Sequence, residues 1–179
     1  MRLFVALLLP VPVLKDLARL CSGLPGARWV RPENMHVTLR FIGEVDGAGA
    51  DDAHLALKGV RGRAFPLALG GLGSFQSGRK IRMLWAGVED QPALVSLRDD
   101  VEKALVRSGL EPERRKFTPH VSLARFNKKP GNKLAPYLEA NGAFSAGPFP
   151  VTAFVLMRSY LGRSGAHYEV MADYPLEDE

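Results

Sequence analysis

Two short stretches of this chain nearly repeat each other. Residues 36–41 read His-Val-Thr-Leu-Arg-Phe, and residues 120–126 read His-Val-Ser-Leu-Ala-Arg-Phe. Polar and apolar residues alternate at the start of each stretch, which predicts two strands that each bury one apolar face. Each strand then presents an imidazole and a hydroxyl on its other face, a polar pair that a purely structural strand does not need.

The alternation places His36 with Thr38 on one face, and His120 with Ser122 in the same way. Histidine has an ordinary pKa near 6.5, so it can donate or accept a proton near neutral pH. Phosphoryl transfer to water needs a base on the attacking water and an acid on the leaving oxygen, roughly in line across phosphorus. Two histidines facing each other across a cleft fit that need, with both hydroxyls on the non-bridging oxygens. The residues alone do not say which histidine is the acid.

Zinc binding is another use of two histidines. Neither stretch carries a Cys, Asp or Glu on the histidine face at the spacing of a ligand, and the nearest carboxylate, Glu33, lies across a predicted turn. We therefore predict no metal and no cofactor.

The segments around the two stretches show strand and helix patterns in turn. Several connections are too short for a parallel crossover, which favours mostly antiparallel sheet. The order β-α-β-β occurs in each half of the chain. This predicts an α+β fold of two pseudo-related lobes with flanking helices and a central cleft, forming a single domain over 1–179. Besides the two stretches, strands are predicted at 2–9, 27–30, 65–69, 81–88, 151–157 and 168–172, helices at 12–23, 51–60, 95–108 and 134–140, and a flexible connection at 70–80.

Composition bounds the partners and the compartment. Lys and Arg outnumber Asp and Glu by 24 to 19, and the net charge of +5 favours anionic partners. The apolar start at 3–13 is too short to span a bilayer and has no cleavage site after it, so we predict a cytoplasmic protein without membrane association. Cys21 is the only cysteine, which excludes an internal disulfide. The sequence is silent on oligomeric state, and a monomer is favoured.

The two stretches resemble the paired His-x-Thr/Ser-x motifs that define the 2H phosphoesterases. Within that superfamily the chain resembles the RNA 2′,3′-cyclic phosphodiesterases, also called 2′-5′ RNA ligases. The resemblance implies metal-independent hydrolysis of a 2′,3′-cyclic phosphate, on an RNA end or a small cyclic nucleotide, to a 2′-phosphate. It also implies that His36 is the proton donor and His120 the proton acceptor. The similar segments cover most of the chain and include 2–7, 29–39, 117–126, 158–159 and 168–170.

Three further residues are predicted to bind substrate. Arg125 matches the family's phosphate-contacting arginine, but strict alternation puts it on the face opposite His120. A bulge or the end of the strand must therefore turn it toward the cleft. Arg40 shares the face of His36 by parity. Phe4 has the flat ring that a base can stack on, although a Phe in a buried first strand is also typical of a core.

Two other functions are consistent with these residues. Joining of RNA ends through a 2′-5′ bond is the same chemistry run in reverse. A non-catalytic RNA-end-binding module would use the positive charge without turnover, although two intact motifs argue against it.

Overall fold

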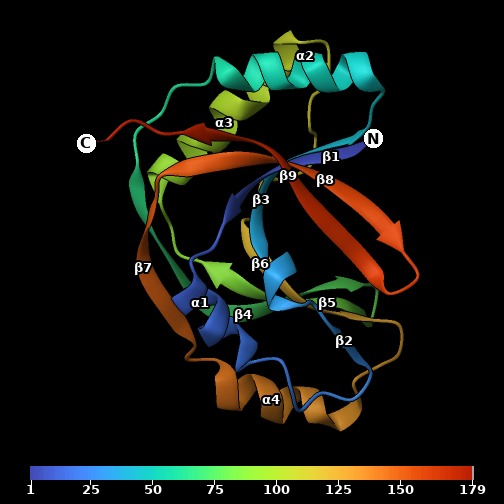
Figure 1. Cartoon of the computed structure of the whole chain (residues 1–179). Coiled ribbons are helices and arrows are strands. Elements are labelled where there is room, and N and C mark those ends of the chain that lie inside the picture. The colour runs from blue at the N-terminus through green and yellow to red at the C-terminus, as the bar shows by residue number, and fades with distance from the viewer. Residues whose placement is uncertain (179) are drawn as a thin grey trace.

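The computed structural model describes residues 1–178, which form a mixed α/β fold around one nine-stranded sheet (Figure 1). Neighbouring strands pair in the antiparallel sense, as the short connections predict. The strands are β1 (Arg2–Leu8), β2 (Ala27–Trp29), β3 (His36–Glu44), β4 (Phe65–Ser77), β5 (Lys80–Val88), β6 (His120–Phe126), β7 (Ser145–Val151), β8 (Ala153–Gly162) and β9 (Gly165–Pro175). The helices are α1 (Val11–Ala18), α2 (Gly47–Lys58), α3 (Pro92–Arg107) and α4 (Leu134–Asn141), with short 3-10 turns η1 (Pro32–Asn34) and η2 (Gly131–Lys133).

The strand order β7-β4-β5-β6-β3-β1-β8-β9 divides into two sets of four that meet where β6 lies beside β3. That junction is narrow: in the described part of the chain, its register consists of the pair Val37–Val121. Helices α2 and α3 cover one set, while α1 and α4 cover the other, to which β2 is added (Figure 1). The predicted α+β class with two lobes is confirmed.

The lobes do not follow the two halves of the chain. The C-terminal strands β8 and β9 extend the lobe that contains β1 and β3, because β8 pairs with β1. Helix α1 comes directly after β1 and yet packs on β7 of the other lobe. Each lobe is therefore completed by segments from distant parts of the sequence, which ties the two together.

Strand β1 is apolar from Leu3 to Leu7, and both of its faces are buried over this stretch. Leu3, Val5 and Leu7 point into the main core between the sheet and the helices. Phe4 and Ala6 point the other way, into a small cluster with Val155 and Met157 of β8. This second cluster lies beside His36 on the same face of the sheet, since β1 pairs with β3 and the Phe4 ring contacts the imidazole.

Residues 70–80 were expected to form a flexible connection, and that expectation is wrong. β4 continues through Ser77 and pairs with β5 as a hairpin. Gly73 in this stretch allows the Trp85 ring to approach the backbone closely, because a Cβ on Gly73 would lie 2.2 Å from a ring carbon of Trp85. The indole of Trp85 therefore packs against the bare backbone of β4.

Strand β7 was not predicted from the sequence. Its segment contains Gly147, Pro148 and Pro150, residues that normally argue against a strand. It lies at the edge of the sheet, where missing N–H donors are tolerated. In contrast to β7, the helix predicted at 95–108 is present as α3, and its apolar stripe is buried.

Helix α2 begins at Gly47, earlier than predicted, because the Asp46 side chain accepts a hydrogen bond from the Gly49 N–H at 2.8 Å. Across residues 1–178, none of the helices combines the length and apolar character needed to cross a membrane.

Candidate active site

The two histidine motifs meet at the junction of the lobes. Val37 and Val121 are paired in the antiparallel sense and fully buried. This register places His36 toward Ser122 and Thr38 toward His120 on the opposite face of the sheet. The four polar side chains that the sequence grouped by motif are thus brought together in space.

Each imidazole is held in the same way. The Nδ1 atom of His36 lies 2.7 Å from the Asn34 carbonyl oxygen, and that of His120 lies 2.6 Å from the Thr118 carbonyl oxygen. A carbonyl oxygen only accepts, so Nδ1 carries the proton in both rings. The Nε2 atoms are therefore the ones left for chemistry, and the backbone two residues earlier sets the orientation of each ring.

The two hydroxyls differ in their partners. Thr38 Oγ1 lies 3.1 Å from Nε2 of His36, whereas the Ser122 hydroxyl donates to the sulfur of Met83 on β5 at 3.2 Å. Sulfur is a weak acceptor, and a serine side chain turns easily. In the structure, only the first motif therefore pairs its hydroxyl with its own histidine.

Aromatic rings surround both histidines. Phe4 and Tyr168 lie against His36, with ring centres 4.9 and 5.4 Å away. Tyr168 comes from β9, more than a hundred residues along the chain. Sequence reasoning included it in a similar segment but did not assign it to the site.

His120 has its own aromatic neighbours, which sequence reasoning missed. Phe75 of β4 meets its ring edge-on at 4.8 Å, and Trp85 of β5 lies 6.1 Å away. No local pattern marks these two residues, because they reach His120 through the pairing of β4, β5 and β6.

Burial lowers the pKa of both histidines below its ordinary value. For His36 the hydrogen bond to the Asn34 carbonyl opposes the burial, and charge on His120 lowers the pKa further. For His120 the Thr118 carbonyl opposes the burial, and the guanidinium of Arg125 lowers the pKa further. Both shifts favour the neutral form of the ring.

A β-bulge follows each motif. The register of β1 with β3 skips Leu39, and that of β5 with β6 skips Leu123. Beyond each bulge the alternation of faces reverses. The residues at equivalent places, Phe41 and Arg125, both become exposed.

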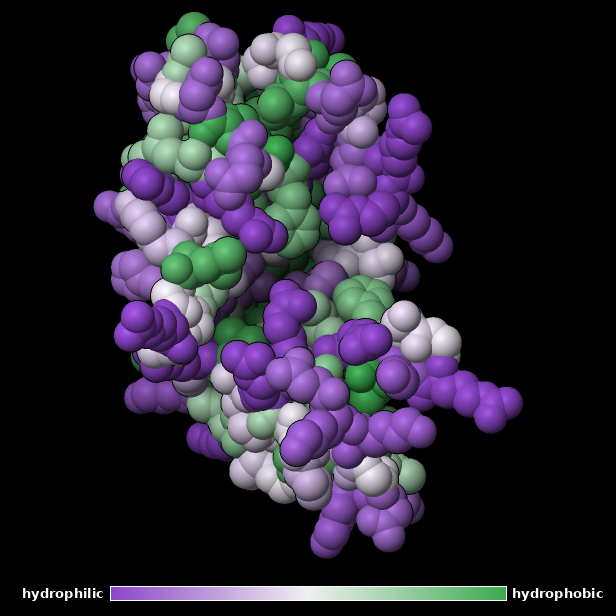
Figure 2. Space-filling model, turned by 90° about the vertical axis from the view of Figure 1, so that its right-hand side faces the viewer, coloured by the Kyte–Doolittle hydropathy of each residue, from purple (hydrophilic) through white to green (hydrophobic). Residues whose placement is uncertain are grey.

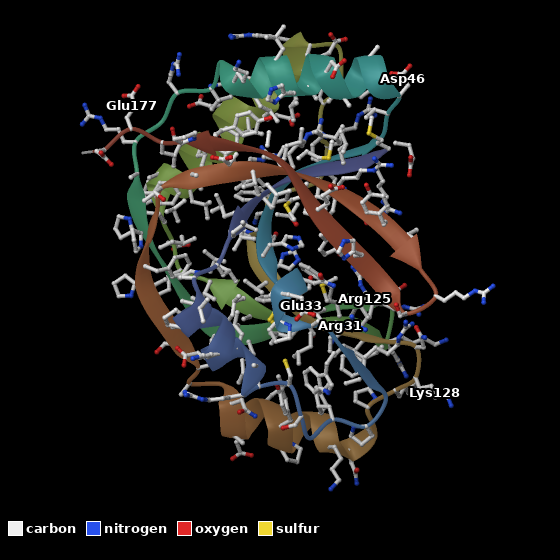
Figure 3. The ribbon with its side chains drawn as sticks, viewed as in Figure 1. Arg31, Glu33, Asp46, Arg125, Lys128 and Glu177 are labelled. Carbon is white, nitrogen blue, oxygen red and sulfur yellow. The ribbon has the colours of Figure 1, made fainter. Side chains whose placement is uncertain are left out.

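The bulge turns Arg125 to the side of His120, as its predicted contact requires. In Figure 3, Arg125 and Arg31 lie near the middle of the molecule. Arg31 follows β2, and β2 pairs with β6, the strand that carries Arg125. Arg125 is thus exposed on the same side of the sheet as His120.

The parity argument for Arg40 is wrong for the same reason. The bulge turns Arg40 toward α3, where it forms an ion pair with Glu102 and donates to the carbonyls of Phe41 and Glu111. Its side chain is only 6% exposed. Glu102 also accepts a hydrogen bond from the Glu113 N–H at 2.7 Å. The buried pair therefore holds the segment that leads to His120 against α3.

Phe4 is not available for base stacking either. It is 4% exposed, with His36 and Tyr168 against its ring. Its place is therefore beneath His36, where it supports the imidazole.

A pocket of about 300 Å³ opens beside His120 and Thr38. Figure 2 shows the surface hollowed at mid-height, between the two halves of the molecule. Within residues 1–178, no group of three or more His, Cys, Asp or Glu side chains is placed to hold a metal ion. The pocket is lined by Thr38, Leu39, Arg40, Phe41, Phe75, Arg98, Glu113, Arg115, Lys116, Phe117, Thr118 and His120.

Comparison with known proteins gives one consistent family. The model of the LigT like Phosphoesterase family matches residues 7–85 and 87–168, which include both histidine motifs. A protein of Aeropyrum pernix named RNA 2′,3′-cyclic phosphodiesterase is 37% identical over 153 residues, covering 84% of this chain and 86% of that protein. The crystal structure of apo LigT from E. coli is similar with a TM-score of 0.81 at 26% identity, covering 98% of this chain and 97% of that one. The E. coli LigT structure complexed with 3′-AMP has a TM-score of 0.78, also at 26% identity and with the same coverage.

Proposed function

Because the chain belongs to the LigT-like phosphoesterase family, we propose that it hydrolyses the 2′,3′-cyclic phosphate at an RNA end to a 2′-phosphate. In this proposal the reaction needs no metal ion and uses His36 and His120 as an acid–base pair. The observation that carries it is the pair of imidazoles on one face of the sheet, each with its Nδ1 held by a backbone carbonyl. The name of the Aeropyrum pernix relative and the 3′-AMP complex of E. coli LigT support the substrate class.

Hydrogen bonding favours His36 as the acid. Its Nδ1 faces the Asn34 carbonyl, and its Nε2 faces a hydroxyl oxygen that can accept, so a doubly protonated ring has partners on both sides. His120 has its backbone partner at Nδ1, and the charge of Arg125 adds to burial in lowering the pKa of His120, which favours its neutral form. This agrees with the order that the family resemblance implies.

The proposed reaction is a single displacement at phosphorus. His120 Nε2 takes a proton from water while the water oxygen bonds to phosphorus. The bond from phosphorus to the 3′ oxygen breaks, and that oxygen takes the proton from His36 Nε2. The product is a 2′-phosphomonoester with a free 3′ hydroxyl, and proton exchange with solvent restores both rings.

The remaining polar groups act on the phosphate charge. In this proposal Thr38 and Ser122 donate hydrogen bonds to the non-bridging oxygens, and Arg125 supplies a positive charge on the side of His120. For Ser122 this requires its hydroxyl to leave Met83, a weak acceptor, when the phosphate binds. The bound anion also raises the pKa of both histidines, which allows His36 to hold its proton.

Product mapping tests the proposal. An oligonucleotide ending in a 2′,3′-cyclic phosphate is incubated with the protein and excess chelator, and the phosphate position is read by mass spectrometry and phosphatase sensitivity. We expect a 2′-phosphate. A 3′-phosphate product, no turnover, or turnover that stops with chelator would contradict it. Salt-sensitive RNA binding without turnover would instead indicate a binding module, and a 5′-hydroxyl RNA in the same reaction reports 2′-5′ joining.

A further inference from the structure

We propose that Arg28 binds the phosphodiester group that joins the last two nucleotides of the RNA substrate. The RNA chain then runs from the two histidines over strands β6 and β2, on the lobe that carries His120. This inference rests on the proposed function and extends it from the cyclic phosphate to the chain attached to it.

Arg28 shares a face of the sheet with the second histidine motif. β2 pairs with β6 in the antiparallel sense, and the register sets Arg28 opposite Arg125. Residues directly opposite each other in such a pair point to the same side of the sheet. On the strand at the other side of β6, Met83 is opposite Arg125, and its sulfur accepts the hydrogen bond from Ser122 at 3.2 Å. Arg28 therefore lies on the side of the sheet that carries Ser122 and His120.

The alternation within β2 gives the same orientation. Trp29 packs against the main core, with its ring centre 6.2 Å from that of Tyr137 on α4. The residue before it in the strand must then point the other way, and Arg28 is exposed. The buried tryptophan thus holds this short strand in place, while the arginine faces solvent on the side of the histidines.

The guanidinium groups of Arg28 and Arg125 are not neutralised by the protein. Like charges directly opposite each other on neighbouring strands repel. In the part of the chain that the structure describes, neither arginine forms an ion pair with a carboxylate. Arg19 on the same lobe does have such a partner, since it pairs with Asp16 at 3.0 Å. A bound phosphate group would offset the repulsion between the two guanidinium groups with charge-assisted hydrogen bonds.

The strands around this pair contain no acidic residue. In the described chain, β2, β4, β5, β6 and β7 of this lobe have no Asp or Glu. The basic residues of these strands are Arg28, Lys80, Arg82 and Arg125. The strands of the other lobe also carry acidic residues, namely Glu44, Glu169 and Asp173. A polyanion is therefore attracted to the lobe that carries His120.

The order of the charged groups matches the order of charges in RNA. Arg125 is close enough to His120 for its charge to lower the pKa of the imidazole. Arg28 comes next, on the strand beyond β6. In the substrate, the cyclic phosphate carries the first charge, and the phosphodiester one nucleotide toward the 5′ end carries the second. We therefore assign the first charge to Arg125 and the second to Arg28.

Positive charge continues beyond Arg28. The segment after β6 returns beside the start of β2, where a Cβ on Gly26 would lie 3.5 Å from the carbonyl oxygen of Lys128 and 3.9 Å from that of Lys129. Figure 3 shows Lys128 further from the middle of the molecule than Arg125. Nucleotides further toward the 5′ end thus remain over a basic surface.

The test removes one charge from the substrate and one from the protein. One substrate is the dinucleotide ApA with a terminal 2′,3′-cyclic phosphate. The other is the same dinucleotide with an internal methylphosphonate linkage, which is uncharged. The variant is Arg28→Gln. Arg2→Gln is the matched control, because it removes the same charge from an exposed strand residue of the other lobe.

The readout is the ratio of kcat/KM for the charged dinucleotide to that for the uncharged one. Both substrates are measured on the same preparation, so a smaller folded fraction cancels in the ratio. We expect a ratio of about ten or more for the unaltered protein, because hydrogen bonds to a charged group are among the stronger ones. In Arg28→Gln the ratio should fall by about tenfold, and in Arg2→Gln it should not change.

Two results overturn the inference. One is an equal ratio in Arg28→Gln and the unaltered protein. The other is an equal fall in Arg28→Gln and Arg2→Gln, which would reflect the overall charge of the protein and not a site at Arg28. Either result leaves the proposed function standing, because the cyclic phosphate is still hydrolysed. An unaltered protein that hydrolyses neither dinucleotide overturns both.

Discussion

Val37 and Val121 face each other across the junction of β3 and β6, and each has a histidine immediately before it in the chain. The valines are buried beneath the sheet, so the histidines point to its other side. One antiparallel register therefore converts a sequence repeat into a two-sided site. The bulge after each motif then adds a residue of different chemistry to each side.

The charge of Arg125 is expected to control His120. A cation beside an imidazole disfavours its protonated form, so it lowers the pKa of His120. Arg125→Gln should therefore raise the pKa of His120 toward its ordinary value, as measured by NMR titration of the ring. Lys128→Gln, which changes a lysine just after β6, is the control and should leave the titration of His120 unchanged. An unshifted pKa of His120 in Arg125→Gln would show that the guanidinium does not act on His120.

The pH dependence of kcat/KM follows from the lowered pKa values of both histidines. Activity of the free enzyme requires one protonated and one neutral ring, which gives a bell-shaped profile. As pH rises above both pKa values the acid loses its proton, and as pH falls below both the base gains one. The maximum should lie below about pH 6.5, the ordinary pKa of histidine. The profile is measured at substrate concentrations below saturation, where the rate reports kcat/KM. A maximum at pH 7.5 or above would contradict the assignment.

The Thr38 hydroxyl is predicted to act in the transition state. Thr38→Val keeps the shape and removes the donor, and loss of one such donor costs about 10²–10³ in kcat. Thr38→Ser is the control, because it keeps the hydroxyl and should retain most of the activity. Steady-state kinetics on a cyclic-phosphate substrate provides the measurement, and equal rates for the valine and serine variants would remove Thr38 from the mechanism.

The Arg40–Glu102 pair is predicted to stabilise the fold. Removing one partner of a buried ion pair leaves an uncompensated charge and costs about 3–5 kcal/mol. Arg40→Met should show this loss in urea unfolding, and Arg40→Met with Glu102→Leu should recover much of it. The exposed pair Arg19–Asp16 is the comparison, where Arg19→Met should cost about 0–1 kcal/mol. A loss in the buried pair that the double variant fails to reduce would contradict this role.

Alternation along strands predicted correctly which residues share a face where the pairing is regular. His36 with Thr38, and His120 with Ser122, share faces because no bulge separates them. The same rule failed one residue past each motif, since a bulge is determined by the pairing with β1 or β5 and leaves no clear mark in the strand's own sequence. Strict alternation therefore put Arg40 on the face of His36 and Phe41 on the buried face with Val37, and the structure reverses both: Arg40 is buried and Phe41 is exposed.

The residues that complete the site come from distant strands. Tyr168, Phe75 and Trp85 reach the histidines only through the order of strands in the sheet. Strand β7 was hidden by its glycine and prolines, which an edge position tolerates. Local patterns predict elements well, but they do not predict which elements become neighbours.

The central claim, that His36 is the acid and His120 the base, can be tested with a modified leaving group. In a substrate whose bridging 3′ oxygen is replaced by sulfur, the leaving thiolate needs no proton, because a thiol has a far lower pKa than an alcohol. With the ordinary substrate, His36→Ala and His120→Ala should each lose about 10²–10⁴ in rate. With the sulfur substrate, the account predicts that His36→Ala recovers most of its activity while His120→Ala does not. Recovery in His120→Ala instead, or in neither variant, would contradict the assignment.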